Sequence, residues 1–173
     1  MKHVILIGYK SVGKSAIGRE LAMRVGVHFI DLDQEVEKLH AAKSGVAINC
    51  RQIMIDIGQR AFRQLEHEAL KSVLNNPESC VISLGGGTPL LQKNKELLFG
   101  HTVVQITAPK SIVFERIMIN GKPAFFSAEE QPLESFNRTW EDRAEIYDSL
   151  ASIKVENSGS VTDIAQIIKE KIS

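Results

Sequence analysis

The chain has 173 residues, 43% of them hydrophobic and 24% charged, so it can bury an ordinary core as one globular domain. Its 21 basic residues balance 21 acidic ones, which excludes a net field that would favour nucleic acid or an anionic membrane. No signal-peptide pattern or membrane-length apolar run is present, so we expect a cytoplasmic protein with no nucleic-acid or membrane partner. We expect Cys50 and Cys80 to be free, buried thiols, because their spacing fits neither a CxxC motif nor a metal site.

The first predicted element is a buried strand over residues 4–7, followed at residues 8–15 by a sequence of the form G-x-x-x-x-G-K-S. Apolar residues four apart within 17–25 then indicate a helix. In such a strand, loop and helix unit, backbone N–H groups converge on phosphate oxygens and the helix end adds partial positive charge. We expect Lys14 to reach the β- and γ-phosphates of a nucleotide and Ser15 to ligate Mg²⁺. The alternative is a glycine-containing turn with a chance lysine, but motif, strand and helix agree.

Apolar runs that predict strands alternate with helical patterns along the rest of the chain. The further strands are expected at residues 28–32, 80–84, 102–106 and 152–155. The helices are marked by four groups of residues at helical spacing: Phe62, Leu65, Ala69 and Val73; Ile112, Arg116 and Ile117; Phe136, Trp140, Ile146 and Leu150; and Ile164, Ile167, Ile168 and Ile172. This alternation predicts an α/β fold whose parallel sheet is covered on both faces, with ligands bound beyond the carboxyl ends of its strands.

Two segments do not fit this alternation, at residues 41–53 and 120–132. The second is rich in polar and small residues and contains Pro123 and Pro132, so we interpret it as a mobile flap. No internal repeat, low-complexity tract or linker divides the chain, and we expect a single domain over 1–173.

Two carboxylates, Asp31 and Asp33, close the second predicted strand, and alternation would put them on one side of the strand end. Near a phosphate loop, one could hold a metal through water while the other orients or deprotonates an attacking hydroxyl. The alternative is a helix N-cap beside a solvated neighbour, since aspartate is common at strand-to-helix junctions.

The third predicted strand ends in the sequence SLGGGTP at residues 83–89. Its three glycines, Gly85, Gly86 and Gly87, offer no side chain, so their use would be close backbone approach to a ligand with N–H donors exposed. A plain wide turn is the alternative.

The segment GQRAFRQLE at residues 58–66 begins a helix and places Arg63 and Glu66 three residues apart on one face. Arg63 could fork onto a ligand carboxylate, with Glu66 fixing its angle. Taken alone, however, the segment favours a solvated surface pair.

Together these motifs resemble the shikimate kinase family, a small member of the group of P-loop proteins similar to nucleoside-monophosphate kinases. The resemblance extends from Val4 to the terminal helix and rests on GYKSVGKS at 8–15, DLD at 31–33, GQRAFRQLE at 58–66, SLGGGTP at 83–89 and RAEIYDSLA at 143–151. It implies a P-loop NTPase fold, a three-layer α/β/α sandwich with a five-stranded parallel sheet. It also implies a lid at about 120–132 and a helical substrate-binding segment at about 33–63.

The resemblance implies roles only where residues of this chain match the family motifs. Shikimate would contact Asp33, Arg63, Gly86 and Arg143, flanked by Gly85 and Gly87. ATP would contact Ser11, Val12, Gly13, Lys14, Ser15, Ala16, Lys122 and, at the adenine, Arg116. Mg²⁺ would be held by Ser15 and, in its outer shell, by Asp31. The catalytic residues would be Lys14, Asp33 and Lys122.

The implied reaction is phosphorylation of the 3-hydroxyl of shikimate by ATP and Mg²⁺, in chorismate and aromatic amino-acid biosynthesis, and we expect a monomer. The chain departs from the family at two places. Lys122 stands where the lid usually carries an arginine; lysine keeps the charge but loses the two-pronged geometry. Residues 34–57 are several positions longer than usual, within the substrate-binding region.

Two other functions are compatible with these motifs. One is another small-metabolite kinase of the same fold, similar to gluconate kinase, whose acceptor would not need the paired arginines Arg63 and Arg143. The other is a non-catalytic ATP-binding module that regulates a partner, in which Lys122 would be a sign of lost catalysis.

Overall fold

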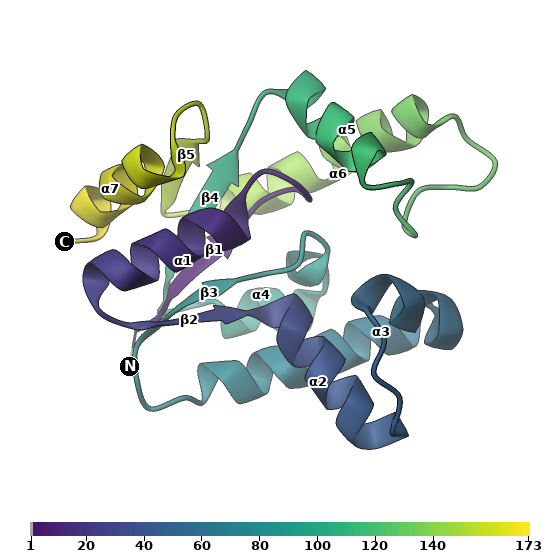
Figure 1. Ribbon diagram of the computed structural model, residues 1–173, viewed down its shortest axis with the longest axis horizontal. Helices are drawn as coiled ribbons and strands as arrows, with labels where there is room; N and C mark the ends of the chain where they lie inside the picture. The colour runs from purple at the N-terminus through teal and green to yellow at the C-terminus, as the bar shows by residue number, and fades with distance from the viewer. Residues whose placement is uncertain (1) are drawn as a thin grey trace.

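Five parallel strands form the central sheet of the computed structural model, which describes residues 2–173 (Figure 1). The strands are β1 (Val4–Ile7), β2 (His28–Asp31), β3 (Cys80–Ser83), β4 (Thr102–Thr107) and β5 (Ile153–Glu156). Their order is β2-β3-β1-β4-β5, and every neighbouring pair is parallel. The predicted α/β fold and its strands are confirmed, with no strand boundary displaced by more than one residue.

Helices cover both faces of the sheet, which explains why the central strands are continuous apolar runs without alternation. The helices are α1 (Lys14–Val25), α2 (Leu32–Ser44), α3 (Cys50–Leu74), α4 (Gln92–Leu97), α5 (Lys110–Ile119), α6 (Pro132–Leu150) and α7 (Val161–Ile172), with a 3₁₀ turn η1 (Thr88–Leu90). Helices α1 and α7 pack together on one face, and α3, α4 and α6 lie on the other (Figure 1). Ile5, Leu6 and Ile7 of β1 are completely buried between these layers.

The segment 41–53 is mostly helical, although we expected it to interrupt the pattern. Helix α2 extends into it, and α3 begins at Cys50. The Asn49 side chain caps α3 by accepting a hydrogen bond of 2.9 Å from the backbone N–H of Gln52. Only residues 45–49 form an irregular connection, and the rest of the segment is helical.

Helix α3 is kinked at Gly58, where φ is 80° and ψ is 159°. This combination is accessible essentially only to glycine. The part of α3 before the kink carries Arg51 and Met54, and the part after it carries Phe62 and Arg63. All four side chains line the same cavity, so the kink wraps one stretch of chain around it.

The predicted flap at residues 120–132 is irregular, as expected, and it packs onto the domain through aromatic side chains. Phe126 is 5% exposed. The ring of Phe125 stands edge-on to that of Tyr9, with centroids 6.3 Å apart. Tyr9 belongs to the loop after β1, so in this structure the flap lies against the phosphate loop.

Cys50 and Cys80 are both free thiols, as the sequence predicts. Cys80 is buried in β3, but Cys50 is partly exposed, so the expectation of burial is wrong for Cys50. It lies at the first turn of α3, where its thiol donates a hydrogen bond of 3.3 Å to the carbonyl of Asp33. Burial and nearby carboxylates, Asp33 first among them, raise the pKa of the Cys50 thiol, so it stays protonated at neutral pH.

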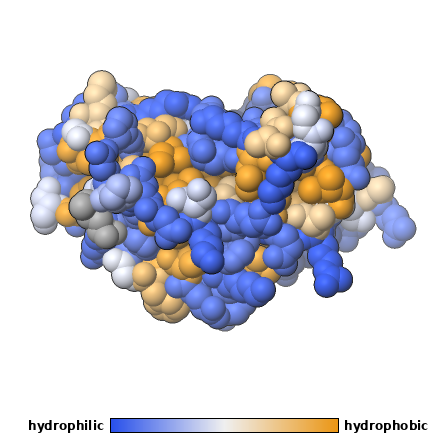
Figure 2. Space-filling view, turned by 90° about the horizontal axis from the view of Figure 1, so that it is seen from below, coloured by the Kyte–Doolittle hydropathy of each residue, from blue (hydrophilic) through white to orange (hydrophobic). Residues whose placement is uncertain are grey.

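The surface mixes hydrophilic residues with separate hydrophobic patches, as Figure 2 shows for one face. Exposed large apolar side chains include Ile55 and Ile57 on α3 and Phe99 after α4. Between residues 2 and 173, no helix combines the length and the apolar character needed to cross a membrane.

Replacing Gly58 by alanine should destabilise the fold through the backbone alone, because an added Cβ would meet no atom within 4 Å. We expect the free energy of unfolding to fall by about 1–3 kcal/mol. The matched control is Gly26→Ala. Gly26 is equally open, but at φ 72° and ψ 36° it occupies the left-handed helical region. That region costs other residues less, about 1 kcal/mol. Urea unfolding compares the two variants, and equal losses would contradict a glycine-only conformation at Gly58.

Candidate active site

The phosphate loop between β1 and α1 owes its shape to two glycines with positive φ. A Cβ on Gly8 would lie 2.2 Å from the carbonyl oxygen of Ile106 in β4. Gly13, with φ 102°, is the N-cap residue of α1. The side chain of Asn157, in the loop after β5, donates a hydrogen bond of 2.9 Å to the carbonyl of Val12. The loop is therefore braced by a distant residue that sequence reasoning missed.

Lys14 lies at the centre of this loop and is 8% exposed. Its ammonium donates hydrogen bonds of 2.9 Å to the carbonyl of Gly8 and 2.8 Å to the carbonyl of Tyr9. Burial lowers the pKa of Lys14 to about 8, and the charges of Asp33 and Asp31 oppose that shift. A buried ammonium in this position suits the neutralisation of a phosphate.

Ser15 and Asp31 lie together beside the loop. The Ser15 hydroxyl donates a hydrogen bond of 2.7 Å to Asp31, and it lies 3.4 Å from the hydroxyl of Ser83. Asp31 also caps α2, since its other oxygen accepts a hydrogen bond of 3.1 Å from the N–H of Asp33. Asp31 can therefore serve both as the N-cap of α2 and as part of a metal site.

The oxygen atoms of Ser15 and Asp31 suit Mg²⁺, a hard cation. Among residues 2–173 no group of three or more His, Cys, Asp and Glu side chains could hold a metal by itself. Magnesium in phosphate-transfer sites usually keeps several waters and binds substrate phosphates, so a small protein contribution fits this metal.

Asp33 lies in the first turn of α2, because β2 already ends at Asp31, so the expectation that strand alternation places the two carboxylates on one side is wrong. Its side chain lines both the phosphate pocket and an adjoining pocket next to α3. The residue as a whole is exposed to the cleft, whereas its carboxyl group is largely surrounded by protein atoms. Desolvation and then the negative charge of Asp31 raise its pKa, while the charges of Lys14 and Lys10 oppose the shift.

Arg63 and Glu66 form a buried ion pair at the wall of the adjoining pocket. Glu66 is 1% exposed and also accepts a hydrogen bond of 2.8 Å from the hydroxyl of Thr88. Burial raises the pKa of Glu66, and the guanidinium of Arg63 opposes the shift. The expectation of a solvated surface pair is therefore wrong, because this face of α3 packs beneath the glycine turn.

The glycine turn after β3 gives these side chains room. A Cβ on Gly87 would lie 2.2 Å from a terminal nitrogen of Arg63, and one on Gly85 would lie 2.6 Å from the carboxylate of Asp33. The hydroxyl of Tyr147 on α6 donates a hydrogen bond of 2.5 Å to the carbonyl of Gly86. The glycines are therefore required by the close approach of Arg63 and Asp33, so the turn is more than a plain wide turn; the approach of a ligand to its backbone stays a prediction.

Arg143 on α6 faces the same pocket and is 5% exposed. Among residues 2–173 no carboxylate lies within 4.0 Å of it. Instead its guanidinium carbon lies 4.3 Å from the ring centre of Phe125 and 5.1 Å from that of Tyr9. A buried cation without an acid partner, in a cavity of about 140 Å³, suits a small anion.

The structure brings together nearly all of the residues predicted from the sequence. The phosphate pocket is lined by Ser11, Gly13, Lys14, Ser15, Ala16, Asp31, Asp33, Gly85 and Gly86, and the adjoining pocket by Asp33, Arg63, Gly85, Gly86, Gly87 and Arg143. The Val12 side chain is buried beneath the loop, and Arg116 donates a hydrogen bond of 3.4 Å to the carbonyl of Ser11.

Lys122 is the exception among the predicted residues. Its ammonium donates a hydrogen bond of 2.7 Å to the carbonyl of Ser127, within the lid segment. Other lid residues line the adjoining pocket, among them Gly121, Pro123 and Phe125, but Lys122 does not. Its predicted place over the phosphates is not the one it occupies here.

Sequence reasoning missed several cavity residues, among them Lys10, Arg51, Met54 and Phe125. Lys10 lies inside the phosphate-loop motif at a variable position, so the motif itself assigned it no role. Arg51 and Phe125 belong to the two segments whose structure the sequence pattern did not define.

Comparisons with known proteins agree with this arrangement. The family model described as "Shikimate kinase" matches residues 10–173. A shikimate kinase of Thermus thermophilus is 36% identical over 171 residues, which cover 98% of this chain and 89% of that protein. The structure of shikimate kinase from Acinetobacter baumannii in complex with shikimate superposes with a TM-score of 0.86 at 27% identity, covering 99% of this chain and 93% of that one.

A gluconokinase structure from Sinorhizobium meliloti matches less well, with a TM-score of 0.60 at 16% identity over 99% of this chain and 95% of that one. That likeness concerns the fold alone.

The free energy of unfolding of Lys14→Met, measured relative to that of the wild type, should be higher at pH 7 than at pH 9.5. The lowered pKa means that between about 8 and 10.5 the unfolded chain binds more protons at Lys14 than the folded chain does. Wild-type stability therefore gains about 2 kcal/mol from this group as the pH rises from 7 to 9.5. Urea unfolding of both proteins at the two pH values measures the difference. A pH-independent difference would show that the pKa of Lys14 is not lowered.

Proposed function

This chain belongs to the shikimate kinase family, and we propose that it transfers the γ-phosphoryl group of ATP to the 3-hydroxyl of shikimate. The products are shikimate 3-phosphate and ADP, in the biosynthesis of chorismate and the aromatic amino acids. The observation that carries the proposal is the buried Arg143 without an acid partner, in a small cavity that shares Asp33 with the phosphate pocket. A coupled assay of ADP release with and without shikimate tests the function.

Arg63 and Arg143 hold the carboxylate of shikimate in this proposal. Arg63 is kept in place by the buried Glu66, and Arg143 is held against aromatic rings. Two cations at a desolvated site favour a carboxylate strongly over a neutral group. The ring hydroxyls of shikimate then face Asp33 and the backbone of Gly86.

Asp33 orients the 3-hydroxyl and accepts its proton as the oxygen bonds to the γ-phosphorus and the bond to the leaving ADP oxygen breaks. Lys14 neutralises charge on the β- and γ-phosphates. The lid, residues 120–132, excludes water, because water that entered would take the phosphoryl group instead. Lys122 could reach the phosphates from the lid only if its bond to Ser127 broke.

We also propose Mg²⁺ as the cofactor, with Ser15 as a direct ligand and Asp31 in the outer shell. When bound, the ion would supply positive charge shared between the β- and γ-phosphate oxygens. Arg116 lies beside the loop at Ser11, where it can pack against the adenine. A monomeric, cytoplasmic enzyme remains our expectation, and sedimentation analysis tests the oligomeric state.

Two other functions would give different results in the same assays. Another small-metabolite kinase, similar to gluconate kinase, would release ADP with its own acceptor and would not depend on the paired arginines Arg63 and Arg143. A regulatory ATP-binding module would bind ATP without turnover. Membership of the shikimate kinase family favours neither.

Arg143→Gln should raise the KM for shikimate and leave ATP affinity nearly unchanged. Since no carboxylate among residues 2–173 forms an ion pair with Arg143, its removal leaves no buried acid behind, unlike removal of Arg63. Loss of one side of a desolvated charge pair costs about 2–5 kcal/mol, a rise in KM of roughly 30-fold or more. Arg60→Gln, on the exposed part of α3, is the matched control and should behave as the wild type. An equal loss of ATP and shikimate affinity would assign Arg143 a structural role.

Asp33→Asn should lower kcat by about 10²–10⁴-fold while ATP binding is little affected. Because the pKa of Asp33 is raised, wild-type kcat/KM should fall as the pH drops through that raised value, above the ordinary range of an aspartate. Asp31→Asn should instead raise the Mg²⁺ concentration needed for half-maximal activity. Asparagine caps a helix as well as aspartate does, so an unchanged kcat for Asp33→Asn would leave Asp33 only a structural role.

A further inference from the structure

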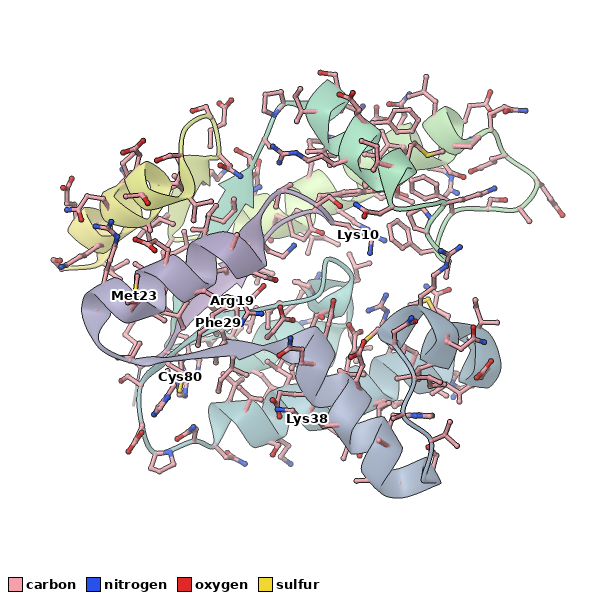
Figure 3. All side chains as sticks on the ribbon, in the orientation of Figure 1. Lys10, Arg19, Met23, Phe29, Lys38 and Cys80 are labelled. Carbon is pink, nitrogen blue, oxygen red and sulfur yellow. The ribbon has the colours of Figure 1, made fainter. Side chains whose placement is uncertain are left out.

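Lys10 occupies a variable position of the phosphate loop, and its side chain lies between the two halves of the cleft. It lines the phosphate pocket together with Lys14 and Ser15, and it lines the adjoining pocket together with Arg63 and Arg143. Figure 3 shows the side chain extending from the loop, away from α1 and towards the space bordered by α3 and the lid. Asp33, Gly85 and Gly86 also line both pockets, and Lys10 is the cation of this set.

The charge of Lys10 is available to a ligand, because no acidic side chain among the described residues forms an ion pair with it. Within the described part of the chain, residues 2–173, no carboxylate lies within 4.0 Å of its ammonium. Its positive charge nevertheless lowers the pKa values of Asp33 and Lys14, so it lies within electrostatic reach of both. These two residues are the predicted base on the acceptor side and the predicted phosphate ligand on the donor side.

The lid does not supply a comparable charge in this structure. Lys122 is bonded to the carbonyl of Ser127 and does not line either pocket. Phosphoryl transfer nevertheless requires positive charge around the equatorial oxygens of the group that is transferred. Lys10 and Lys14 are the two lysines that line the phosphate pocket, and Lys14 sits deeper, on its own loop carbonyls.

We infer that Lys10 binds the γ-phosphoryl group during transfer and is therefore a further catalytic residue of this enzyme. The inference rests on the proposed function. In the step, the 3-hydroxyl oxygen of shikimate bonds to the γ-phosphorus, its proton goes to Asp33, and the bond from the γ-phosphorus to the ADP oxygen breaks with its electron pair leaving on ADP. Lys10 donates hydrogen bonds to the equatorial oxygens throughout and transfers no proton.

At position 10 a lysine suits this task better than an arginine would. Its compact ammonium sits on a flexible stem with three donors, so it can follow the phosphoryl group from the donor side to the acceptor side. The stem starts from the loop itself, which is braced by Gly8 and Asn157. Its charge is therefore present in the cleft whatever the position of the lid, residues 120–132.

The test compares Lys10→Met, Lys10→Arg and Lys122→Met with the wild type. Lys71→Met is the matched control, since it removes the same charge from an exposed position at the far end of α3. Lys10→Met should lower kcat by about 10²-fold, the usual effect of losing one transition-state donor. Lys10→Arg should recover most of that loss, and Lys122→Met should cost less than Lys10→Met.

A binding measurement separates a catalytic role from a structural one. ADP with aluminium fluoride and Mg²⁺ mimics the planar phosphoryl group, whereas ADP alone lacks it. Lys10→Met should weaken the aluminium fluoride complex by about 10²-fold in the presence of shikimate and leave ADP affinity unchanged. The single tryptophan, Trp140, provides a fluorescence signal near the phosphate loop.

Three outcomes would overturn the inference: wild-type kcat in Lys10→Met, equal weakening of ADP and the aluminium fluoride complex, or a larger loss in Lys122→Met. If the wild type fails to phosphorylate shikimate, the proposed function fails. The aluminium fluoride measurement, made with and without an acceptor, would still decide whether Lys10 binds a transferring phosphoryl group.

Discussion

The buried carboxylate of Glu66 is the constraint around which the proposed acceptor half of the cleft is built. A carboxylate that is 1% exposed requires partners, and it takes them from Arg63 on its own helix and from Thr88 on the turn after β3. The carbonyl of Thr88 in turn accepts a hydrogen bond of 2.8 Å from Asn94, whose amide oxygen lies 2.8 Å from a ring nitrogen of His67. This chain of bonds connects α3, η1 and α4, and it holds the Arg63 guanidinium at a set angle.

Charge is distributed unevenly although the chain as a whole is neutral. Positive groups gather at the carboxyl ends of the parallel strands, where burial makes them costly: Lys14 has a lowered pKa and Arg143 has no acid partner among the described residues. Asp33 in the same cleft has a raised pKa, because burial disfavours its negatively charged form. The burial of Lys14 and Arg143 is therefore unfavourable in the free protein, and an anionic ligand offsets that cost, so binding and stability are linked.

The sequence was sufficient for the fold because its signals are local and redundant. Apolar runs marked all five strands, and the glycines and lysine of the phosphate loop lie next to one another in the chain. Features that depend on distant contacts were not predictable: the burial of the Arg63–Glu66 pair depends on the turn at Gly87, and the position of Lys122 depends on the path of the lid. The helical character of residues 41–53 was missed because its cap, Asn49, follows an irregular stretch.

The stacking of Arg143 against Phe125 connects the acceptor site to the lid. A guanidinium that packs its face on aromatic rings keeps its N–H donors available in the plane, so one residue can serve an acceptor carboxylate and a lid side chain together. An acceptor that orders Arg143 would then also favour the docked lid, and a docked lid would favour acceptor binding. Thermodynamic reciprocity requires the two effects to be equal in size. The affinity of the cleft for an acceptor is therefore partly a property of the lid, communicated through a single cation.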